Sequence, residues 1–371
     1  MASRDLNTRG YQARSGQGDP EPLNVLNSAA TSLLRRVPAD VWCAVMLDPA
    51  TLLDTGGFHE QGFRAESMPR LFEIEHGEQT GVDNIRALAR RRAASSLLSV
   101  STGGDLARNV YYRDILAPEG LADELRVTLK ADGCTWGLLV LCRARESAPF
   151  TAKDLAVAEA ASAPAAAQLR RALLLKGIDD VEVPDAPGLV TARPDGRITY
   201  VSRIADYWLA QVAERRRDTG ITTYTLTAVL SHARDRTSAD PVSARVRLHS
   251  GRWLTISAWT EALGGEGGEE MVIASLTPSL PVALNALVLN GYGLTPRERQ
   301  IAQFVILGRA YAEIGDLLGI REQTVNDHMR KVFAKTGVDN RIELCTNLFT
   351  RHHLPVLADP PLSTDGRLMG S

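Results

Sequence analysis

The chain has 371 residues, which at about 100 to 200 residues per domain predicts two or three domains. Its composition, 44% hydrophobic and 23% charged residues, is ordinary for a globular protein. The net charge of −2 excludes a protein that binds nucleic acid through a surface that is basic all over, but it allows a small basic binding face. The four cysteines lack the spacing of a disulfide framework or a zinc site, and no apolar run approaches the roughly 20 residues of a membrane span. The N-terminus shows no signal peptide, so we expect a cytoplasmic protein without membrane contact.

The two ends of the chain are poor in large apolar residues. Residues 1–21 are rich in Arg, Gly, Ser, Asp and Pro, a composition that predicts disorder. Residues 354–371 carry repeated Pro and Gly and are expected to form a tail.

Residues 22–176 carry the pattern of an α+β domain. A helical pattern begins at residue 22, an apolar strand covers residues 42–47, and residues 86–96 read as a basic helix. Two strands, 125–130 and 135–141, flank Asp132-Gly133, which suits the positive φ angles of a tight hairpin. Thr151 with Asp154 marks the start of a long helix that ends near residue 175. We therefore predict an antiparallel sheet flanked by helices.

Residues 180–278 predict a smaller α+β domain. Strands 188–192 and 197–201 form one hairpin, and strands 244–249 and 252–257 form another. A helix over 204–212 separates the hairpins, and 271–276 supplies the last strand. Residues 264–268 read as a flexible loop tip.

The remaining residues, 282–353, have helical periodicity. Thr295, Pro296 and Glu298 form a capping box with proline at the first helical position. A short helix over 311–318 and a turn at Gly319 lead to a helix over 322–335, and a last helix covers 341–349. Two short helices joined by a glycine turn, of which the second has a polar and basic face, are typical of helix-turn-helix DNA binders.

The motifs of this segment resemble the LuxR-type C-terminal domain. They are Leu294–Glu298, Glu313-Ile314, Leu318–Ile320, Thr324-Val325, His328, Lys335–Val338 and Arg341. The resemblance implies an all-α four-helix domain, here 287–353, whose third helix enters the major groove and whose fourth helix dimerises. Carried over by position, it implies base contacts from Asn326, Asp327 and Arg330, phosphate contacts from Thr324, Lys331 and Lys335, and dimer contacts from Arg341, Leu344, Cys345 and Leu348.

Some residues depart from the family pattern. Asn326 stands where response regulators usually have Lys, and Ala310 and Arg321 stand where many members place a capping Ser. Each lost cap costs about 1 kcal/mol, so we predict that an isolated 285–353 fragment is marginally stable and melts below about 65 °C. Residues 292–353 hold nine Lys or Arg and seven Asp or Glu, a net charge of +2 that favours a homodimer on two half-sites.

The first domain resembles a GAF domain, a similarity carried by the 125–141 hairpin with Gly137, by Phe150-Thr151 and by the long helix. Residues 188–276 resemble a PAS domain through Pro194–Ile198, Tyr200 and Trp208-Leu209. Both resemblances imply ligand-binding or interaction modules. A small-molecule ligand is expected in the first domain, although the sequence identifies neither it nor its binding residues.

Other signals have both a functional and a plain interpretation. Asp48, at the end of a strand, is either a phospho-acceptor or a turn residue. Cys43, Cys134 and Cys142 are either chromophore or redox sites or small buried hydrophobes. His232 and His249 are either haem ligands or ordinary histidines. The plain interpretation is favoured in each case, so no catalytic residue, metal or cofactor is predicted.

We predict a sequence-specific, dimeric transcriptional regulator that binds double-stranded DNA, contacts RNA polymerase and is modulated by its N-terminal domains. An alternative is a protein-interaction scaffold whose helix-turn-helix contacts the transcription machinery instead of DNA. A signalling enzyme is disfavoured because the sequence carries no nucleophile, metal or nucleotide motif.

Overall fold

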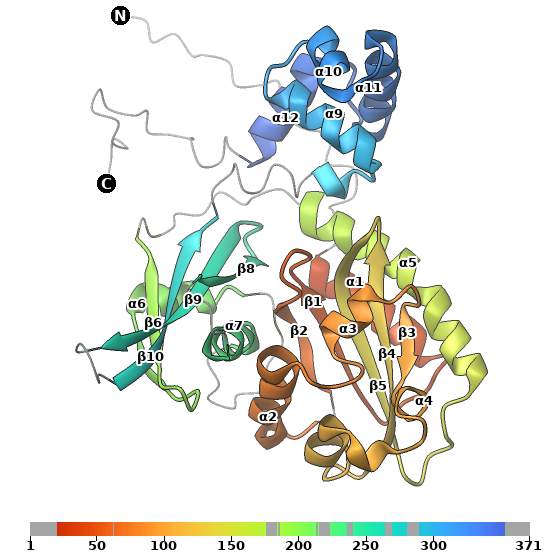
Figure 1. The fold of residues 1–371 in the computed structure, drawn as a ribbon, viewed down its shortest axis with the longest axis vertical. Helices are drawn as coiled ribbons and strands as arrows, with labels where there is room; N and C mark the ends of the chain where they lie inside the picture. The colour runs from red at the N-terminus through yellow and green to blue at the C-terminus, as the bar shows by residue number, and fades with distance from the viewer. Residues whose placement is uncertain are drawn as a thin grey trace, which may run out of the picture.

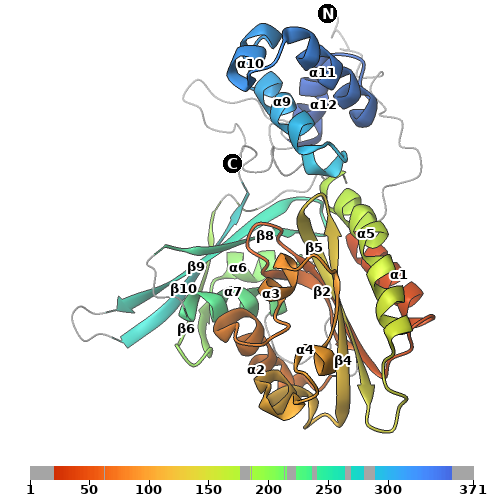
Figure 2. The same ribbon diagram turned by 45° about the vertical axis from the view of Figure 1, so that its right-hand side comes forward.

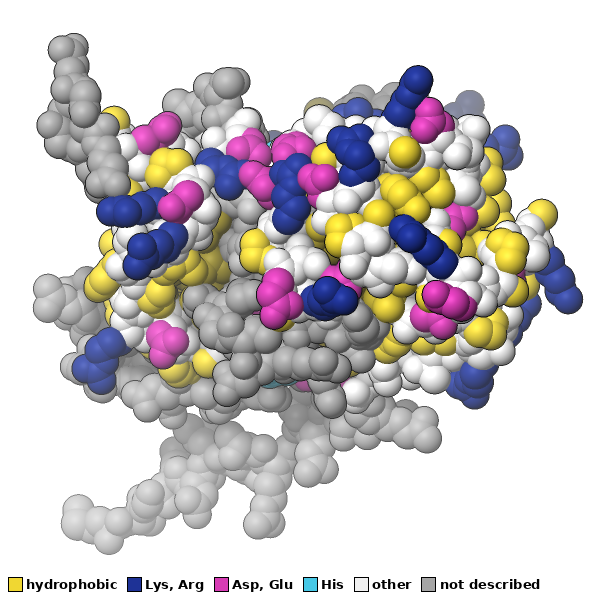
Figure 3. Space-filling model, turned by 90° about the horizontal axis from the view of Figure 1, so that it is seen from below, with side chains coloured by type: hydrophobic (Ala, Val, Ile, Leu, Met, Phe, Trp, Pro, Cys, Tyr) yellow, Lys and Arg dark blue, Asp and Glu magenta, His cyan; other side chains and the backbone are white. Residues whose placement is uncertain are grey.

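The structure is a computed structural model that describes residues 21–61, 63–175, 184, 186–212, 214, 223–235, 240–263, 269–279 and 289–352. Two α+β units lie side by side, and a helical unit lies above the end of one of them (Figure 1). Of the segment 1–21 predicted to be disordered, residues 1–20 lie outside the described residues, whereas Glu21 is described and precedes the first helix. The tail 354–371 and the loop tip 264–268 also lie outside the described residues. Seen from below, the described surface mixes basic and acidic side chains (Figure 3), in line with the near-zero net charge.

The first unit is built on a five-stranded sheet of antiparallel pairs in the order β2-β1-β5-β4-β3. Its strands are β1 (Val41–Leu47), β2 (Asp54–Gln61), β3 (Ser95–Leu97), β4 (Leu121–Ala131) and β5 (Cys134–Ala144). Its α-helices are α1 (Pro22–Leu34), α2 (Met68–Phe72), α3 (Ile85–Arg90), α4 (Leu98–Ser101) and α5 (Ala152–Leu175). Short 3-10 turns cover Ala65–Ser67 and Leu106–Arg108, and π-helical turns cover Glu73–Glu78 and Tyr112–Leu116.

The hairpin and the long helix predicted in this unit are confirmed. Asp132 and Gly133 have φ angles of 50° and 77°, the left-handed values that the tight turn requires. At the start of α5, the Thr151 hydroxyl accepts from the Asp154 amide at 3.2 Å, and Asp154 accepts from the Thr151 amide at 2.9 Å. The closing helix therefore begins at its capping residues.

Two predictions for the first unit were wrong or incomplete. The helix expected over 86–96 ends at Arg90, and residues 95–97 form the edge strand β3 against β4. Glu159 of α5 accepts hydrogen bonds from the Ala94 and Ser95 amides, which fixes this strand in place. Strand β2 was not predicted because Gly56 and Gly57 interrupt its pattern. A Cβ at Gly57 would lie 2.3 Å from the Ala44 carbonyl oxygen, so only glycine allows β2 to approach β1.

The second unit has a five-stranded sheet in the order β7-β6-β10-β9-β8, again built from antiparallel pairs. Its strands are β6 (Gly188–Ala192), β7 (Ile198–Val201), β8 (Val242–Arg247), β9 (Trp253–Leu263) and β10 (Glu269–Pro278). Its helices are α6 (Arg203–Leu209) and α7 (Tyr224–Arg234). The predicted hairpins and the final strand are present, which confirms a second α+β unit.

Helix α7 was not predicted, and it lies between the two units. Tyr224 and Ala228 belong to the apolar cluster on one face of the first sheet. Leu226, Val229 and Leu230 belong to the core of the second sheet. Because α7 is apolar on two faces, it lacks the single amphipathic stripe by which a surface helix is recognised from sequence.

The helical unit contains α9 (Pro296–Ile306), α10 (Tyr311–Leu318), α11 (Glu322–Thr336) and α12 (Arg341–His352). Its capping box is present as predicted: the Thr295 hydroxyl accepts from the Glu298 amide and Glu298 accepts from the Thr295 amide. The chain enters this unit at the C-terminal end of α5 (Figure 2). There, Leu289 and Leu294 are buried, and a Cβ on Gly291 would lie 2.7 Å from Cβ of Leu174.

None of the helices in the described part of the chain has the length and apolarity that a membrane span requires.

Candidate nucleic-acid interface and sensor cavity

Helix α11 has one buried face and one exposed polar face. Val325, Met329 and Val332 are buried in the core of the helical unit. Thr324, Asp327, Arg330 and Lys331 are exposed on the rest of the helix, and Asn326 is half-buried. The Arg330 side chain is 77% exposed, so its guanidinium is free to reach a ligand. The structure thus brings the residues predicted for base contacts onto one helix surface.

Two of these residues interact with each other. Nη1 of Arg330 lies 3.6 Å from Oδ1 of Asp327, which also accepts from Nε2 of Gln323 at 3.4 Å. The carboxylate of Asp327 therefore offsets part of the positive charge of Arg330.

Lys335 has a contact that the sequence did not indicate. Its ammonium lies 2.7 Å from Oε2 of Glu298 and donates to the carbonyl of Gly293 at 3.3 Å. Burial by itself would raise the pKa of Glu298, but the hydrogen bonds from Lys335 and from the Thr295 amide outweigh it, and the net pKa is lowered. Lys335 thus joins the end of α11 to the start of α9, and a phosphate contact would have to share its ammonium.

The inner helix starts lack side-chain caps, as the sequence predicts. Neither Ala310 before α10 nor Arg321 before α11 makes a capping hydrogen bond from its side chain. The turn between the two helices is tight, with Gly319 at a φ of 64°. A Cβ on Gly315 would lie 2.7 Å from the Ile320 carbonyl oxygen, so glycine is needed where the turn folds back on α10.

Of the four residues expected for dimerisation on α12, the structure buries Leu344. Leu344 is 1% exposed and belongs to the core, and Nη2 of Arg341 donates to the Val305 carbonyl at 3.3 Å. Cys345 is half-buried, and the side chain of Leu348 lies outside the described residues. Ile342, which the sequence reasoning missed, is 77% exposed.

Asp48 is held by the second unit. Its carboxylate, 1% exposed, accepts from the Arg245 amide at 2.8 Å, from Nε at 3.1 Å and from Nη2 at 2.8 Å. This contact supports the plain interpretation of Asp48 and gives the residue a role at the junction between the units.

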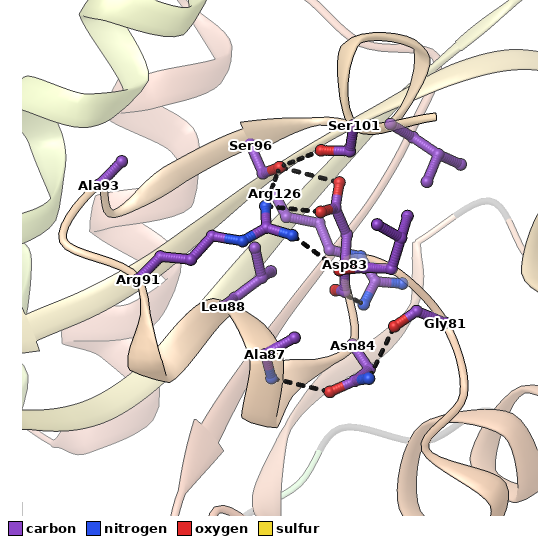
Figure 4. A network of polar contacts seen from close by, with 12 residues as sticks. Gly81, Asp83, Asn84, Ala87, Leu88, Arg91, Ala93, Ser96, Ser101 and Arg126 are labelled. Carbon is purple, nitrogen blue, oxygen red and sulfur yellow. Dashed lines mark hydrogen bonds and ion pairs between the residues drawn. The ribbon is translucent and has the colours of Figure 1, made fainter. Parts of the chain in front are cut away.

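The first unit holds a buried network of charged and polar groups beneath α3 (Figure 4). Asp83 accepts from Oγ of Ser96 at 2.8 Å and pairs with Nη1 of Arg91 at 2.7 Å. Its backbone carbonyl accepts from Nη1 of Arg126 at 2.9 Å. This arginine also pairs with Glu75 and Glu124, at 2.6 and 2.5 Å. Together these contacts fix the wall of a cavity that lies between the sheet and helices α2 and α3.

The remaining thiols and histidines have structural surroundings. Burial raises the pKa of the Cys43 and Cys142 thiols, so neither is a reactive thiolate. Cys134 is half-buried at the hairpin. A ring nitrogen of His232 lies 2.9 Å from the His76 carbonyl oxygen. Within the described ranges, no group of three or more His, Cys, Asp or Glu side chains could hold a metal ion.

Comparison with protein families identifies two of the three units. Residues 293–347 match the bacterial regulatory proteins of the luxR family. Residues 21–169 match the GAF domain. The chain therefore carries a LuxR-type helix-turn-helix domain and a GAF domain, as the two resemblances predicted.

The curated relatives match only part of the chain. The transcriptional regulatory protein UhpA of Salmonella typhimurium is 39% identical over 74 residues, which are 20% of this chain and 37% of that protein. The UhpA of Escherichia coli is 41% identical over 56 residues, 15% of this chain and 29% of that protein. The chain thus spans well under half of the length of these relatives.

Among solved structures, a GAF/HD domain protein from Geobacter sulfurreducens is 15% identical, covering 40% of this chain and 92% of that one, with a TM-score of 0.30. Scores this low establish no common fold across the whole chain.

Proposed function

We propose that this chain is a sequence-specific, DNA-binding transcriptional regulator that reads its operator through α11. The observation that carries the proposal is the exposed polar face of α11 in a LuxR-type domain, with Arg330 77% exposed at its centre. A helix of this size fits the major groove, and an arginine fork matches the O6 and N7 acceptors of guanine.

Within this proposal, Asn326, Asp327 and Arg330 contact bases, while Thr324 and Lys331 contact phosphates. Lys335 serves first to hold α11 on α9 through Glu298. The regulator acts in the cytoplasm as a homodimer on two half-sites, because a net charge of +2 over 292–353 gives one copy little attraction for DNA. We propose Ile342, exposed on α12, as a dimer contact in place of the buried Leu344.

The test compares two neighbouring cations of α11 in the full-length chain. Genomic fragments are selected with the native protein, and affinity for the best site is measured over a range of salt concentrations. Arg330→Ala should cost about 1 to 3 kcal/mol of specific binding and relax the preference at one base pair. Lys331→Ala, the matched control, should weaken all sequences alike and reduce the salt slope by about one. Unchanged affinity of Arg330→Ala for the best site would refute the base contact.

A second candidate function is a protein-interaction scaffold, with RNA polymerase as its partner. Leu307, after α9, and Leu317, on α10, are 74% and 57% exposed, and we propose them as the side chains that such a partner would contact. DNA affinity that is absent, or that does not depend on salt, would favour this function. Salt-dependent affinity with a preferred sequence would favour the regulator.

A further inference from the structure

The helix-turn-helix domain contacts the first unit at the last turn of α5 (Figure 2). Residues 173–175 of this turn, all leucines, are at most 6% exposed. Consecutive residues of an α-helix point about 100° apart, so three buried neighbours in a row require that the helix end is covered from several sides. Residues 289–294, which lead into α9, supply part of this cover. Leu289 and Leu294 are fully buried and belong to the same apolar cluster as Leu174.

Two glycines allow residues 289–294 to lie this close to α5. A Cβ on Gly291 would lie 2.7 Å from Cβ of Leu174, closer than two such atoms approach in proteins. Gly293 has a φ angle of 68°, in the left-handed region that favours glycine. The backbone itself therefore forms this side of the contact. We call it the entry contact, because the chain enters the helix-turn-helix domain here.

Arg170 of α5 links the entry contact to the β4–β5 hairpin of the GAF domain. Its Nη1 atom pairs with Oδ2 of Asp132, at the turn of that hairpin. A Cβ on Gly293 would lie 3.5 Å from Nη2 of Arg170, so the guanidinium also lies against the backbone of Gly293. The Arg170 side chain is only 9% exposed, although arginine is usually exposed. Its rigid planar fork, buried in this way, fixes the distance between the hairpin and the entry contact.

The same glycine is connected to the helix proposed to read DNA. The carbonyl of Gly293 accepts from Nζ of Lys335, at the C-terminal end of α11, at 3.3 Å. This ammonium also lies 2.7 Å from Oε2 of Glu298, at the start of α9. A continuous set of contacts thus runs from the hairpin of the GAF domain, through Arg170 and Gly293, to α11. A fixed Gly293 therefore fixes the direction in which α11 points relative to the GAF domain.

The entry contact leaves the polar face of α11 accessible. The side chains of Arg330 and Asp327 are 77% and 54% exposed while the contact is formed. The contact therefore acts on the position of α11 and does not block its access to DNA. In a dimer on two half-sites, the direction of each α11 determines the distance between the two recognition helices, and this distance selects the spacing of the half-sites.

We propose that Arg170 is a positioning residue which, through the entry contact, sets the half-site spacing that the dimer accepts. The proposal rests on the dimeric DNA-binding regulator of the proposed function. It couples the hairpin turn of the GAF domain to the choice of operator, because Asp132 in that turn holds the guanidinium that contacts Gly293.

The experiment uses the full-length chain and synthetic duplexes that carry the half-site recovered in the genomic selection. One duplex holds a single half-site. The others hold two half-sites whose spacing grows by single base pairs across one helical turn of about 10 bp. The native protein should bind its best spacing about ten-fold or more tightly than a spacing half a turn away, which places the second half-site on the opposite side of the duplex. A native protein that binds all spacings alike would overturn the proposal.

Arg170→Met keeps the apolar stem of the side chain and removes its charge, while Asp132, 44% exposed, stays solvated. The preference between the two spacings should fall to about three-fold or less, with the single half-site bound within about two-fold of the native affinity. Arg171→Met, an exposed change on the same helix, is the matched control and should keep the native preference. Weaker binding to every duplex with the preference retained would show a merely structural role and refute the positioning one.

Gly291→Ala opens the entry contact from its other side. The added Cβ does not fit beside Leu174, so the spacing preference should fall at least as far as in Arg170→Met. Gly81→Ala, whose Cβ would meet its nearest atom at 3.9 Å, is the matched control. Without DNA, hydrogen exchange over residues 289–294 should become faster in Arg170→Met and in Gly291→Ala. Exchange that is unchanged in both variants would overturn the proposal.

The single half-site separates this proposal from the one on which it rests. If the native protein does not bind even the single half-site, the proposed function is refuted. If the native protein and the variants bind it alike and the variants keep the native spacing preference, only the positioning role of Arg170 is refuted.

Discussion

The contact between the GAF domain and the second unit differs in kind from the contact between the helix-turn-helix domain and the end of α5. The GAF domain and the second unit share α7, and two arginines of the second unit reach carboxylates of the first: Arg245 binds Asp48 and Arg234 binds Glu73 at 3.0 Å. Among the described residues, the segment 289–294 of the helix-turn-helix domain lies on the end of α5, and Leu289 and Leu294 belong to the same apolar cluster as Leu174. There, a Cβ on Gly291 would lie 2.7 Å from Cβ of Leu174 and 2.9 Å from Cδ2 of Leu175, so this contact is apolar and close.

Below, the GAF domain and the second unit together are called the block, and the helix-turn-helix domain is called the attached domain. Because α7 packs on both sheets and Asp48 is buried in its ion pair with Arg245, we expect the GAF domain and the second unit to unfold together, since separating them exposes apolar surface and an unpaired carboxylate.

The largest expected effect is at the ion pair between the units. Arg245→Met leaves the buried Asp48 carboxylate without its charged partner, and about 3 kcal/mol of stability should be lost. Chemical denaturation should then show the single transition of the block broaden or split. Arg197→Met, which removes an exposed arginine of the same unit, is the control. A single transition at the native midpoint would show that the ion pair does not hold the units together.

A smaller effect is expected inside the helix-turn-helix domain. Lys335→Met removes the partner of Glu298, whose side chain is 4% exposed, and should cost about 2 kcal/mol. The effect should appear as faster hydrogen exchange in α9 and α11, with the exchange of the two sheets unchanged. Lys331→Met, an exposed change on the same helix, should leave exchange as it is. If hydrogen exchange in the two sheets also became faster, the stability of the helix-turn-helix domain would be coupled to that of the block.

The same pair gives this domain a pH dependence with a defined sign. The pKa of Glu298 is lowered in the folded chain from its usual value of 4.5, so the unfolded chain binds protons more readily. The stabilisation is therefore present above about pH 4.5 and is lost as the pH falls through the folded pKa. In Lys335→Met the slope of domain stability in this acidic window should become shallower. An unchanged slope would assign the pH dependence to other carboxylates.

An element could be predicted from the sequence when neighbouring residues determine it, and could not when contacts between distant parts of the chain determine it. The helix-turn-helix was predictable because its capping box, glycine turn and apolar stripe are local patterns, each set by neighbouring residues. The hairpin at Asp132-Gly133 was predictable for the same reason. Helix α7, strand β2 and the short β3 depend on contacts far apart in the chain: α7 packs on two sheets, and β2 requires Gly57 to lie against Ala44. Local patterns do not carry such information.

The candidate site shows the same limit. The family motif placed Asn326, Asp327 and Arg330 on the exposed face of α11, but it could not show that Lys335 is bound to Glu298 from α9. It also could not separate Leu344 from Ile342, because both lie on α12 and only the packing of the folded chain decides which is buried. Asp48 and Arg245 are almost two hundred residues apart, and nothing in the sequence links them.

The smallest expected effect is a gain in stability of the helix-turn-helix domain from a substitution outside the segment 289–294 that lies on α5. Ala310 precedes α10 with φ of −74° and ψ of 154°, the extended backbone from which a serine hydroxyl caps a helix, yet it makes no side-chain cap. Ala310→Ser should therefore stabilise the domain by about 1 kcal/mol and slow hydrogen exchange at the start of α10. Ala310→Gly, which gives no hydroxyl, is the matched control, and the isolated 285–353 fragment should melt higher with serine than with alanine. If serine also slowed hydrogen exchange in the two sheets of the block, the helix-turn-helix domain would be coupled to the block in stability, as the GAF domain and the second unit are expected to be to each other.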